Sequence, residues 1–147
     1  PVLLQECTIG DECVIIGGGV VGVETALFLD GLGKKVTVLV RSKLKYAEEA
    51  VNNVQCMNDM LKASGVKVIE GAVPVRFTEN AVVYSCGGAE VTVHSDTTVL
   101  ATGYHPLNAL ADELEELDVE CDVIGNAVKA RKIINATGEA YMAVRRM

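Results

Sequence analysis

A glycine-rich turn between an apolar run and a helical pattern constrains the fold of this chain more than any other feature. The run Cys13–Ile16 is typical of a short buried strand, and it leads directly into Gly17-Gly18-Gly19-Val20-Val21-Gly22. Apolar residues then recur at helical spacing until Gly31-Leu32-Gly33, a typical helix stop. The β-branched run Val36–Val40 predicts a second strand. This order predicts a βαβ unit, and therefore an α/β fold with a Rossmann-like parallel sheet covered on both faces.

The three spaced glycines of this turn match the pattern G-x-G-x-x-G, and each has its own physical reason. Gly17 permits the tight turn, where a Cβ would be penalised. Gly19 lets the backbone approach a pyrophosphate, and Gly22 lets the helix pack closely on the strand. The helix N-terminus then presents unpaired N–H groups to the anion. With a strand before it and a helix after it, the turn predicts a dinucleotide site over residues 17–22.

The residues after the second predicted strand bear on the choice between the two nicotinamide dinucleotides. NAD-binding units place Asp or Glu about twenty residues beyond the glycines, where it holds the ribose hydroxyls. Val40 occupies this place, and Arg41-Ser42-Lys43 follow it, with Lys45 close behind. Because Arg grips a phosphate through two hydrogen bonds and Lys adds charge, the segment favours NADP(H) over NAD(H). A solvated basic turn in an acidic protein is the alternative interpretation.

Glu24 lies two residues beyond the third glycine, which predicts a place on the first turn of the helix. A carboxylate there is favoured by the helix dipole, and this is one explanation of the residue. A role beside the nicotinamide is the other explanation, and the sequence leaves both open.

The rest of the chain predicts one further helix, a strand, a small antiparallel meander and a C-terminal segment of a different kind. A helix is expected over 47–64, with Val51, Val54, Met57 and Leu61 on one face, and a strand over 66–69. From Gly71 apolar residues tend to recur at every second position, which is typical of strands. Four brief strands are expected, over 73–77, 81–85, 90–94 and 97–101. After Pro106 we expect a surface helix or an ordered loop over 107–117, a strand over 121–124 and a helix over 132–147. In the last helix, Ile133, Ile134, Ala140, Ala143 and Val144 are available for burial.

Composition excludes several classes of function. With 13 Lys+Arg against 20 Asp+Glu the net charge is −7, and two Phe, four Tyr and no Trp give few stacking rings, so we expect no nucleic-acid partner. No apolar run has the roughly 18–20 residues of a membrane span. The five cysteines form no C-x-x-C pair, which indicates no metal site and a reducing, cytoplasmic compartment. Because the chain opens at Pro1 without Met, we expect a piece of a longer protein.

Three motifs in order resemble the pyridine-nucleotide-dependent flavoprotein oxidoreductases. They are Val14-Ile15-Ile16-Gly17-Gly18-Gly19-Val20-Val21-Gly22-Val23-Glu24-Thr25-Ala26, then Ala101-Thr102-Gly103-Tyr104, then Val123-Ile124-Gly125-Asn126-Ala127. The stretch from Ala127 to Ile133 is similar to one branch, the multidomain NADH:flavin oxidoreductases such as 2,4-dienoyl-CoA reductase and trimethylamine dehydrogenase.

The resemblance implies a domain organisation. Residues 1–104 would be an NAD(P)H-binding domain with linkers, inserted into an FAD-binding domain to which residues 105–147 return. Ala101, Thr102 and Gly103 would contact the flavin. Gly125-Asn126 stands where the family has Gly-Asp, whose carboxylate accepts a hydrogen bond from the flavin, so Asn126 departs from the pattern. The other explanation for this pair is an ordinary turn after a strand.

The resemblance also implies an activity and partners. The nicotinamide would deliver hydride to FAD, upstream flavin domains of the same polypeptide would be partners, and FMN and an iron–sulfur cluster would lie upstream. No side chain of this chain is assigned a catalytic role, His94 and His105 included, and the isolated piece is expected to be inactive. Two other functions compete: a nucleotide-binding or redox-sensing module without catalysis, and an S-adenosylmethionine-dependent methyltransferase core. The predicted meander speaks against the methyltransferase, which should continue with βα pairs.

Overall fold

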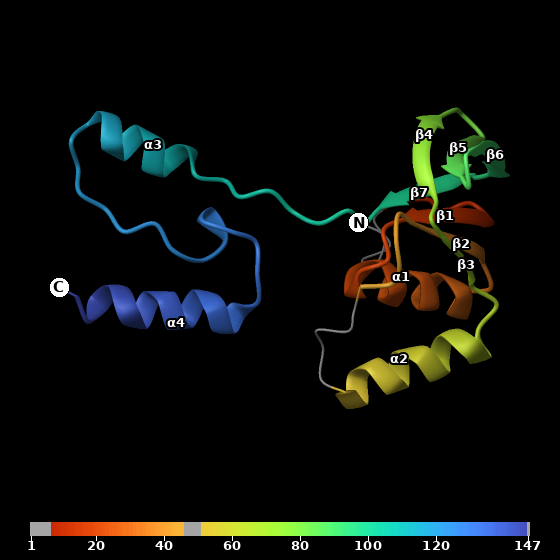
Figure 1. Ribbon diagram of the computed structural model, residues 1–147, viewed down its shortest axis with the longest axis horizontal. Helices are drawn as coiled ribbons and strands as arrows, with labels where there is room; N and C mark the ends of the chain where they lie inside the picture. Colours follow the sequence, from red (N-terminus) through yellow and green to blue (C-terminus); the bar gives the residue numbers. More distant parts are fainter. Residues whose placement is uncertain (1–6, 46–50, 147) are drawn as a thin grey trace. The chain divides into compact units, whose positions relative to one another are not determined.

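The computed structural model describes residues 7–45 and 51–146, and the chain divides into two compact units, Pro1–Thr102 and Gly103–Met147 (Figure 1). Each unit is described by itself below.

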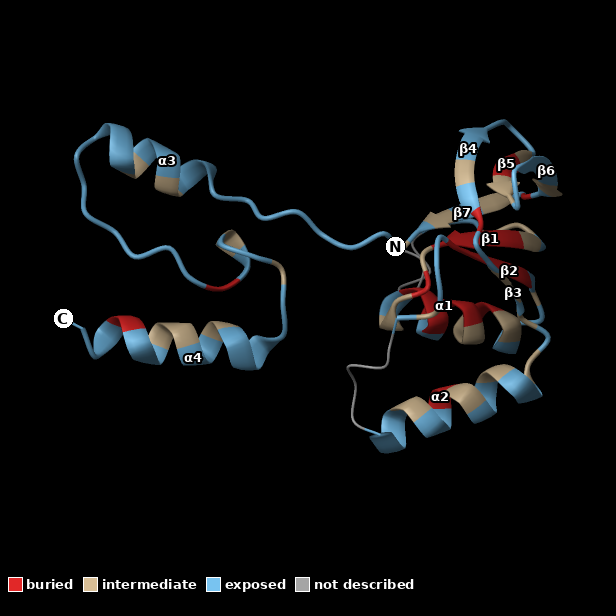
Figure 2. Ribbon diagram, viewed as in Figure 1, coloured by how far each residue is buried: buried red, intermediate tan, exposed pale blue. Residues whose placement is uncertain are grey.

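A four-stranded parallel sheet forms the centre of the first unit. Its strands are β1 (Glu12–Ile16), β2 (Lys35–Val40), β3 (Lys67–Glu70) and β7 (Thr97–Leu100), in the order β3-β2-β1-β7. The two middle strands are almost entirely buried, which explains their continuous apolar sequence (Figure 2). The predicted α/β fold with a Rossmann-like parallel sheet is confirmed.

Helix α1 (Val20–Gly31) covers one face of this sheet, and helix α2 (Val51–Ala63) packs on α1 (Figure 1). Helix α1 packs on β1 and β2 through Ala26 and Leu29, and it ends where the sequence predicts, since Gly33 has a φ of +77°. Helix α2 packs on α1 through Met57, which contacts Val23. Residues 47–50 of this predicted helix lie outside the described residues. Of the four residues predicted on one face of this helix, Met57 is buried, whereas the Val51 side chain is 83% exposed.

A three-stranded antiparallel sheet covers the other face. It consists of β4 (Val73–Phe77), β5 (Ala81–Cys86) and β6 (Ala89–His94), in that order. Val82 and Tyr84 of β5 pack against Val14, Ile16 and Leu39 of the parallel sheet. The three strands confirm the predicted meander up to His94.

The fourth strand predicted for the meander, residues 97–101, was misplaced. This segment forms β7, which pairs parallel with β1. The turn before it directs the chain there, because the Asp96 N–H donates to the Glu12 carbonyl (2.8 Å) and the Asp96 carboxylate accepts the N–H groups of Asp11 (3.1 Å) and Glu12 (2.9 Å). A long-range contact thus decides the partner of this strand.

The Asp96 turn makes folding stability depend on pH. The hydrogen bond from the Glu12 N–H is the chief reason that the pKa of Asp96 lies below its ordinary value. Because the folded pKa is lowered, the carboxylate stabilises the fold above the unfolded pKa of about 3.9, and the contribution is lost as pH falls through the folded pKa. We expect Asp96→Asn to lower the unfolding temperature at neutral pH, and the difference in unfolding temperature from wild type to shrink as pH falls below the unfolded pKa of about 3.9. Circular dichroism measures this, with Glu79→Gln as the control. A difference in unfolding temperature that stays constant with pH would contradict the role of the Asp96 charge.

The second unit contains helix α3 (Ala109–Glu116), a 3₁₀ turn η1 (Gly125–Ala127) and helix α4 (Ile133–Val144). Of the two alternatives predicted for 107–117, the helix is the one observed. The strand predicted over 121–124 was wrong: Ile124 has extended backbone angles, but within the described part of the chain these residues pair with no strand.

Few of the residues of the last helix that are available for burial are buried within this unit. Ile133, Ile134 and Val144 are 84%, 75% and 69% exposed, whereas Ala143 is buried and Ala140 is half-buried (Figure 2). Helix α4 therefore uses its small residues within the unit and leaves its large apolar residues uncovered. An exposed apolar stripe of this kind indicates a surface that another part of a protein covers.

Candidate functional site

Gly17 makes the sharp turn at the carboxyl end of β1. Its φ is +121°, a conformation that side chains rarely adopt, and its N–H donates to the Leu39 carbonyl at 3.0 Å. A Cβ built on Gly17 would lie 2.2 Å from the Ala101 carbonyl oxygen. The turn therefore requires glycine, for the reason that the sequence predicts and for a second one: the backbone after β7 passes directly against it.

Gly22 and Gly19 differ in what surrounds them. A Cβ on Gly22 would lie 2.1 Å from the Gly17 carbonyl oxygen, so this glycine brings the helix against the turn. A Cβ on Gly19 would meet no atom of the chain within 4 Å. Nothing in the described fold therefore requires glycine at position 19. Open space above this backbone is what an approaching diphosphate needs.

The first turn of α1 faces that space. Gly19 is the N-cap residue, has extended backbone angles, and makes no side-chain capping bond. The N–H groups of Val20, Val21 and Gly22 come first in the helix and have no carbonyl of a preceding turn to bond. They provide a set of backbone donors at the positive end of the helix dipole.

The carboxyl end of β1 lies between those of β2 and β7, where the strand order changes direction. Ligands of open α/β sheets bind at such a switch point. The structure brings Ala101 to this point, since its N–H donates to the Ile16 carbonyl at 2.8 Å, and Thr102 follows it. Gly103, with a φ of +98°, begins the second unit. Gly17 of the first sequence motif and Ala101 of the second thus meet at the carboxyl edge of the sheet.

The basic segment after β2 lies against the glycine turn. Arg41, Ser42 and Lys43 are exposed on a bend, and Val40 before them is buried, so no carboxylate stands at the end of β2. The Lys45 N–H donates to the Gly18 carbonyl at 2.6 Å, and Lys45 forms a parallel bridge with Gly19. The basic segment and the turn therefore form one continuous surface.

Sequence reasoning placed Gly18 in the cofactor site but missed its role in packing, and it missed Leu44 altogether. A Cβ on Gly18 would lie 2.7 Å from Val40 Cγ1 and 3.1 Å from Leu44 Cδ2, so Gly18 is required by packing under the turn. Leu44 is the apolar residue that fills this space. Its only sequence signal is its place as a single large apolar side chain among basic and polar neighbours.

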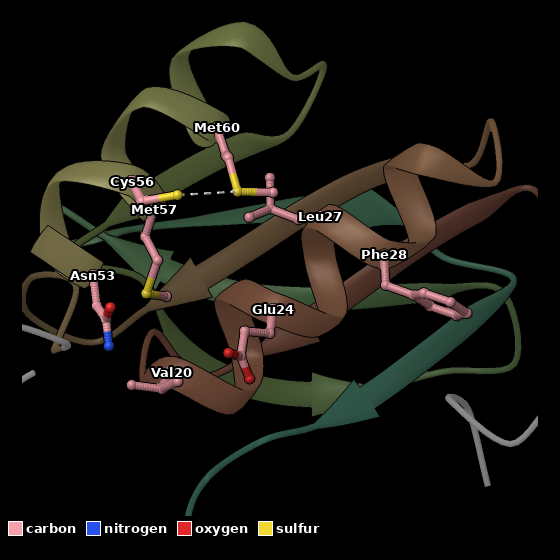
Figure 3. A pocket seen from close by; sticks show the side chains of 8 residues that line it. All are labelled: Val20, Glu24, Leu27, Phe28, Asn53, Cys56, Met57 and Met60. Atoms are coloured by element: carbon pink, nitrogen blue, oxygen red, sulfur yellow. Dashed lines mark hydrogen bonds between the residues drawn. The ribbon is translucent and has the colours of Figure 1, made fainter.

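The placement predicted for Glu24 was wrong. Helix α1 begins at Val20 and has no acidic residue in its first turn, so Glu24 lies one turn further on, where the dipole gives little stabilisation. Its side chain lines a groove of about 520 Å³ between α1 and α2 (Figure 3). The groove is lined by Val20, Glu24, Leu27 and Phe28 of α1 and by Asn53, Cys56, Met57 and Met60 of α2.

Gly125 and Asn126 form a hydrogen-bonded turn in the second unit. The Gly125 N–H donates to Glu139 Oε2 at 2.7 Å, and the Glu139 carboxylate also pairs with the Arg131 guanidinium. Chiefly the Gly125 bond, and then Arg131, hold the pKa of Glu139 below its usual value. Asn126 Oδ1 accepts the Arg131 N–H at 3.2 Å. The amide oxygen considered for a flavin contact thus already accepts a hydrogen bond within its own turn.

The remaining candidate groups do not form a reactive cluster. His94 is exposed on β6, and the nearest carboxylates to its Nδ1 are Glu12 (3.7 Å) and Asp96 (3.8 Å). All five cysteines are free thiols, and among the described residues no three acidic, histidine or cysteine side chains are grouped as metal ligands. No helix in the described ranges has both the length and the apolar character needed to cross a membrane.

Comparisons with known proteins match this geometry. The family model for pyridine nucleotide-disulphide oxidoreductases matches residues 3–139. The chain is 30% identical to the cinnamate reductase of Clostridium sporogenes, over 95% of this chain and 22% of that protein. It is 31% identical to the NADH oxidase of Thermoanaerobacter brockii, over 89% of this chain and 20% of that protein. The solved structure of a 2-naphthoyl-CoA reductase superposes with a TM-score of 0.81 at 26% identity, over 95% of this chain and 22% of that one.

The chain thus spans about a fifth of the length of these relatives. The relatives in the matched family are named as oxidoreductases, among them an NADH oxidase and dihydrolipoyl dehydrogenases. The family model covers nearly the whole chain, and its characteristic nucleotide fold is the one described above. The chain belongs to the pyridine nucleotide-disulphide oxidoreductase family.

Proposed function

We propose that this chain is the NAD(P)H-binding portion of an FAD-dependent oxidoreductase, with residues 1–104 as the nucleotide domain and 105–147 as a return into the flavin domain. The observation that carries the proposal is the open space over Gly19. Gly17 and Gly22 are fixed by the fold, whereas Gly19 has no structural need to be glycine, and it stands at the switch point of the sheet. A diphosphate is the group that such a turn accommodates.

The residues of the first unit would hold and orient the dinucleotide. The N–H groups of Val20, Val21 and Gly22 would donate to the diphosphate, and Ala101 and Thr102 border the same edge of the sheet. When both cofactors are bound, the reduced nicotinamide supplies a hydride and the flavin accepts it. The contribution of the protein would be to align the two rings and to exclude water, which requires no acid or base from this chain.

The second unit fits a segment that completes another domain. Residues 121–124 have no strand partner among the described residues, and Ile133, Ile134 and Val144 of α4 are exposed. Upstream flavin-domain sequence of the same polypeptide would supply the missing sheet and cover the helix. Gly125 and Asn126 would then lie at the flavin, with the Asn126 side chain as a neutral substitute for the family's carboxylate.

The branch that includes 2,4-dienoyl-CoA reductase and trimethylamine dehydrogenase remains our proposal for the whole enzyme. Its support is the stretch from Ala127 to Ile133 and the length of the relatives, which leaves room for an FMN barrel and an iron–sulfur cluster upstream. Family membership excludes the methyltransferase alternative. A redox-sensing module would bind the same dinucleotide, and hydride transfer in an enzyme that contains the flavin domain separates the two.

We expect the 147-residue chain to bind NADPH more tightly than NADH, because Arg41 and Lys43 would pair with the 2′-phosphate. Arg41→Glu should reverse this preference, since it removes a phosphate partner and provides an acceptor for the ribose hydroxyls. Loss of one charged hydrogen-bonding partner predicts a change of about tenfold or more in the ratio of the two dissociation constants. Isothermal titration calorimetry measures both constants, with Arg76→Glu, on the exposed edge strand β4, as the charge-matched control.

The two parts of this proposal fail separately. Absence of heat with either dinucleotide at millimolar concentration would contradict nucleotide binding itself. Binding of both with an unchanged ratio in Arg41→Glu would contradict only the assignment of Arg41.

A further inference from the structure

Leu44 occupies an unusual position for a residue of a basic surface segment. Arg41, Ser42, Lys43 and Lys45 are exposed, but the Leu44 side chain is half-buried. It packs against the cluster between the sheet and α1, which includes Val40 and Ala26. It also packs against the cluster between α1 and α2, whose buried members are Val23 and Met57. One side chain thus fixes this segment to β2 and to both helices.

The segment is fastened to the glycine turn at the same place. The residue after Leu44 donates its N–H to the Gly18 carbonyl at 2.6 Å and bridges Gly19. Gly18 leaves room for this contact, because a Cβ there would lie 3.1 Å from Leu44 Cδ2. The apolar contact and the backbone hydrogen bond therefore act on neighbouring residues and hold the segment in one register against the turn.

We propose that Leu44 is a positioning residue for cofactor discrimination: by anchoring residues 41–45 against the glycine turn it holds Arg41 and Lys43 where the 2′-phosphate of a dinucleotide would lie. The inference rests on the proposed dinucleotide site and goes beyond it, since Leu44 itself touches no phosphate. It assigns the choice between NADPH and NADH to an apolar anchor as well as to the charged side chains.

Leu44 would act by ordering the basic segment before the dinucleotide binds. Long cationic side chains lose conformational freedom when they bind, and a fixed backbone reduces that loss. Without the anchor, the segment must be ordered by the 2′-phosphate at the moment of binding, which weakens the affinity for NADPH. NADH has no 2′-phosphate, so its affinity depends on the glycine turn and little on contacts with Arg41 and Lys43. The loss of Leu44 should therefore act unequally on the two dinucleotides.

The test compares Leu44→Ala with Leu44→Met by calorimetric titration with NADPH and with NADH. We expect Leu44→Ala to raise the NADPH dissociation constant by about tenfold and the NADH constant by less than about threefold, since ordering two side chains accounts for an effect of this size. Leu44→Met keeps the volume and should restore the wild-type ratio. The matched control is Leu32→Ala, which makes the same change at the far end of α1 on a side chain that is also partly exposed.

The outcomes separate this inference from the function on which it rests. If the wild-type chain binds neither dinucleotide, the proposed function fails and the role of Leu44 fails with it. If the wild type binds both and Leu44→Ala changes both constants by the same factor, or neither, Leu44 is a structural residue only and the inference is overturned. If Leu44→Ala does not fold, as thermal unfolding would show, Leu44→Val provides the same comparison. An unchanged ratio in that folded variant overturns the inference too.

Discussion

Replacing Gly19 by alanine is expected to abolish most dinucleotide binding while leaving the fold intact. A Cβ at this position meets no atom of the chain, so the unfolding temperature should stay within a few degrees of wild type. The same Cβ would occupy the space through which a diphosphate approaches the N–H groups of α1. Because a displaced diphosphate loses several charge-assisted hydrogen bonds at once, we expect affinity for NADPH and NADH to fall by about a hundredfold or more.

Calorimetry and thermal unfolding on one sample of Gly19→Ala measure both quantities. A control glycine must lie in open space and must not have a positive φ. Gly88 lies in open space but has a positive φ, whereas Gly31 meets both conditions. Gly31→Ala is therefore the matched variant and should retain binding. Full affinity in Gly19→Ala would show that no ligand approaches this backbone, and the proposed site would be wrong.

Replacing Gly22 by alanine is expected to have the opposite signature, a loss of stability. Its Cβ, which is attached directly to the helix backbone, would lie 2.1 Å from the backbone carbonyl oxygen of Gly17. Since no side chain can move away, the helix must shift from the turn, at a cost of about 3 kcal/mol. For a unit of about a hundred residues this corresponds to a fall of roughly 12–24 °C in the unfolding temperature.

The control for this prediction is again Gly31→Ala, in the same helix, where alanine should be neutral or stabilising by about 0.5–1 kcal/mol. Thermal unfolding followed by circular dichroism compares the two variants directly. Equal unfolding temperatures for Gly22→Ala and wild type would contradict the close approach of α1 to the turn.

The local part of the fold could be predicted because its signals are local. The apolar run before Gly17, the glycines and the helix stop at Gly31–Gly33 each specify a conformation through neighbours in sequence. The same holds for the strands of the antiparallel sheet, because their alternating apolar and polar residues indicate strands even when the partner strands are unknown. These signals were enough for the βαβ unit and for the place of the glycine turn.

Strand partners and burial could not be predicted, because they depend on distant residues. Thr97–Leu100 has the same pattern as a meander strand, but it pairs with β1, which it joins through contacts between residues distant in sequence, among them those of Asp96 with Asp11 and Glu12. Residues 121–124 have strand-like composition but no partner in the described part of the chain. The apolar residues of α4 make burial available, but Ile133 and Ile134 are exposed in the described part of the chain.

In the candidate site, too, the features that depend on neighbours in sequence could be predicted and those that depend on distant residues could not. Gly17, Gly19 and Gly22 could be assigned separate roles from a motif, and the structure agrees with the turn at Gly17 and the close packing at Gly22. Leu44 and the packing role of Gly18 were missed, because both come from a contact between two loops that the motif does not describe. Glu24 was placed one turn too early, since the first helical residue could not be fixed from sequence alone.

The most direct test is a nuclear magnetic resonance titration of the isotopically labelled 147-residue chain with NADPH. If the glycine turn binds the diphosphate, the amide signals that shift most will be those of residues 17–22, followed by 41–45 and 101–102, while those of the edge strand β4 stay in place. Shifts spread evenly over the chain, or confined to residues remote from the carboxyl end of β1, would contradict binding at this turn.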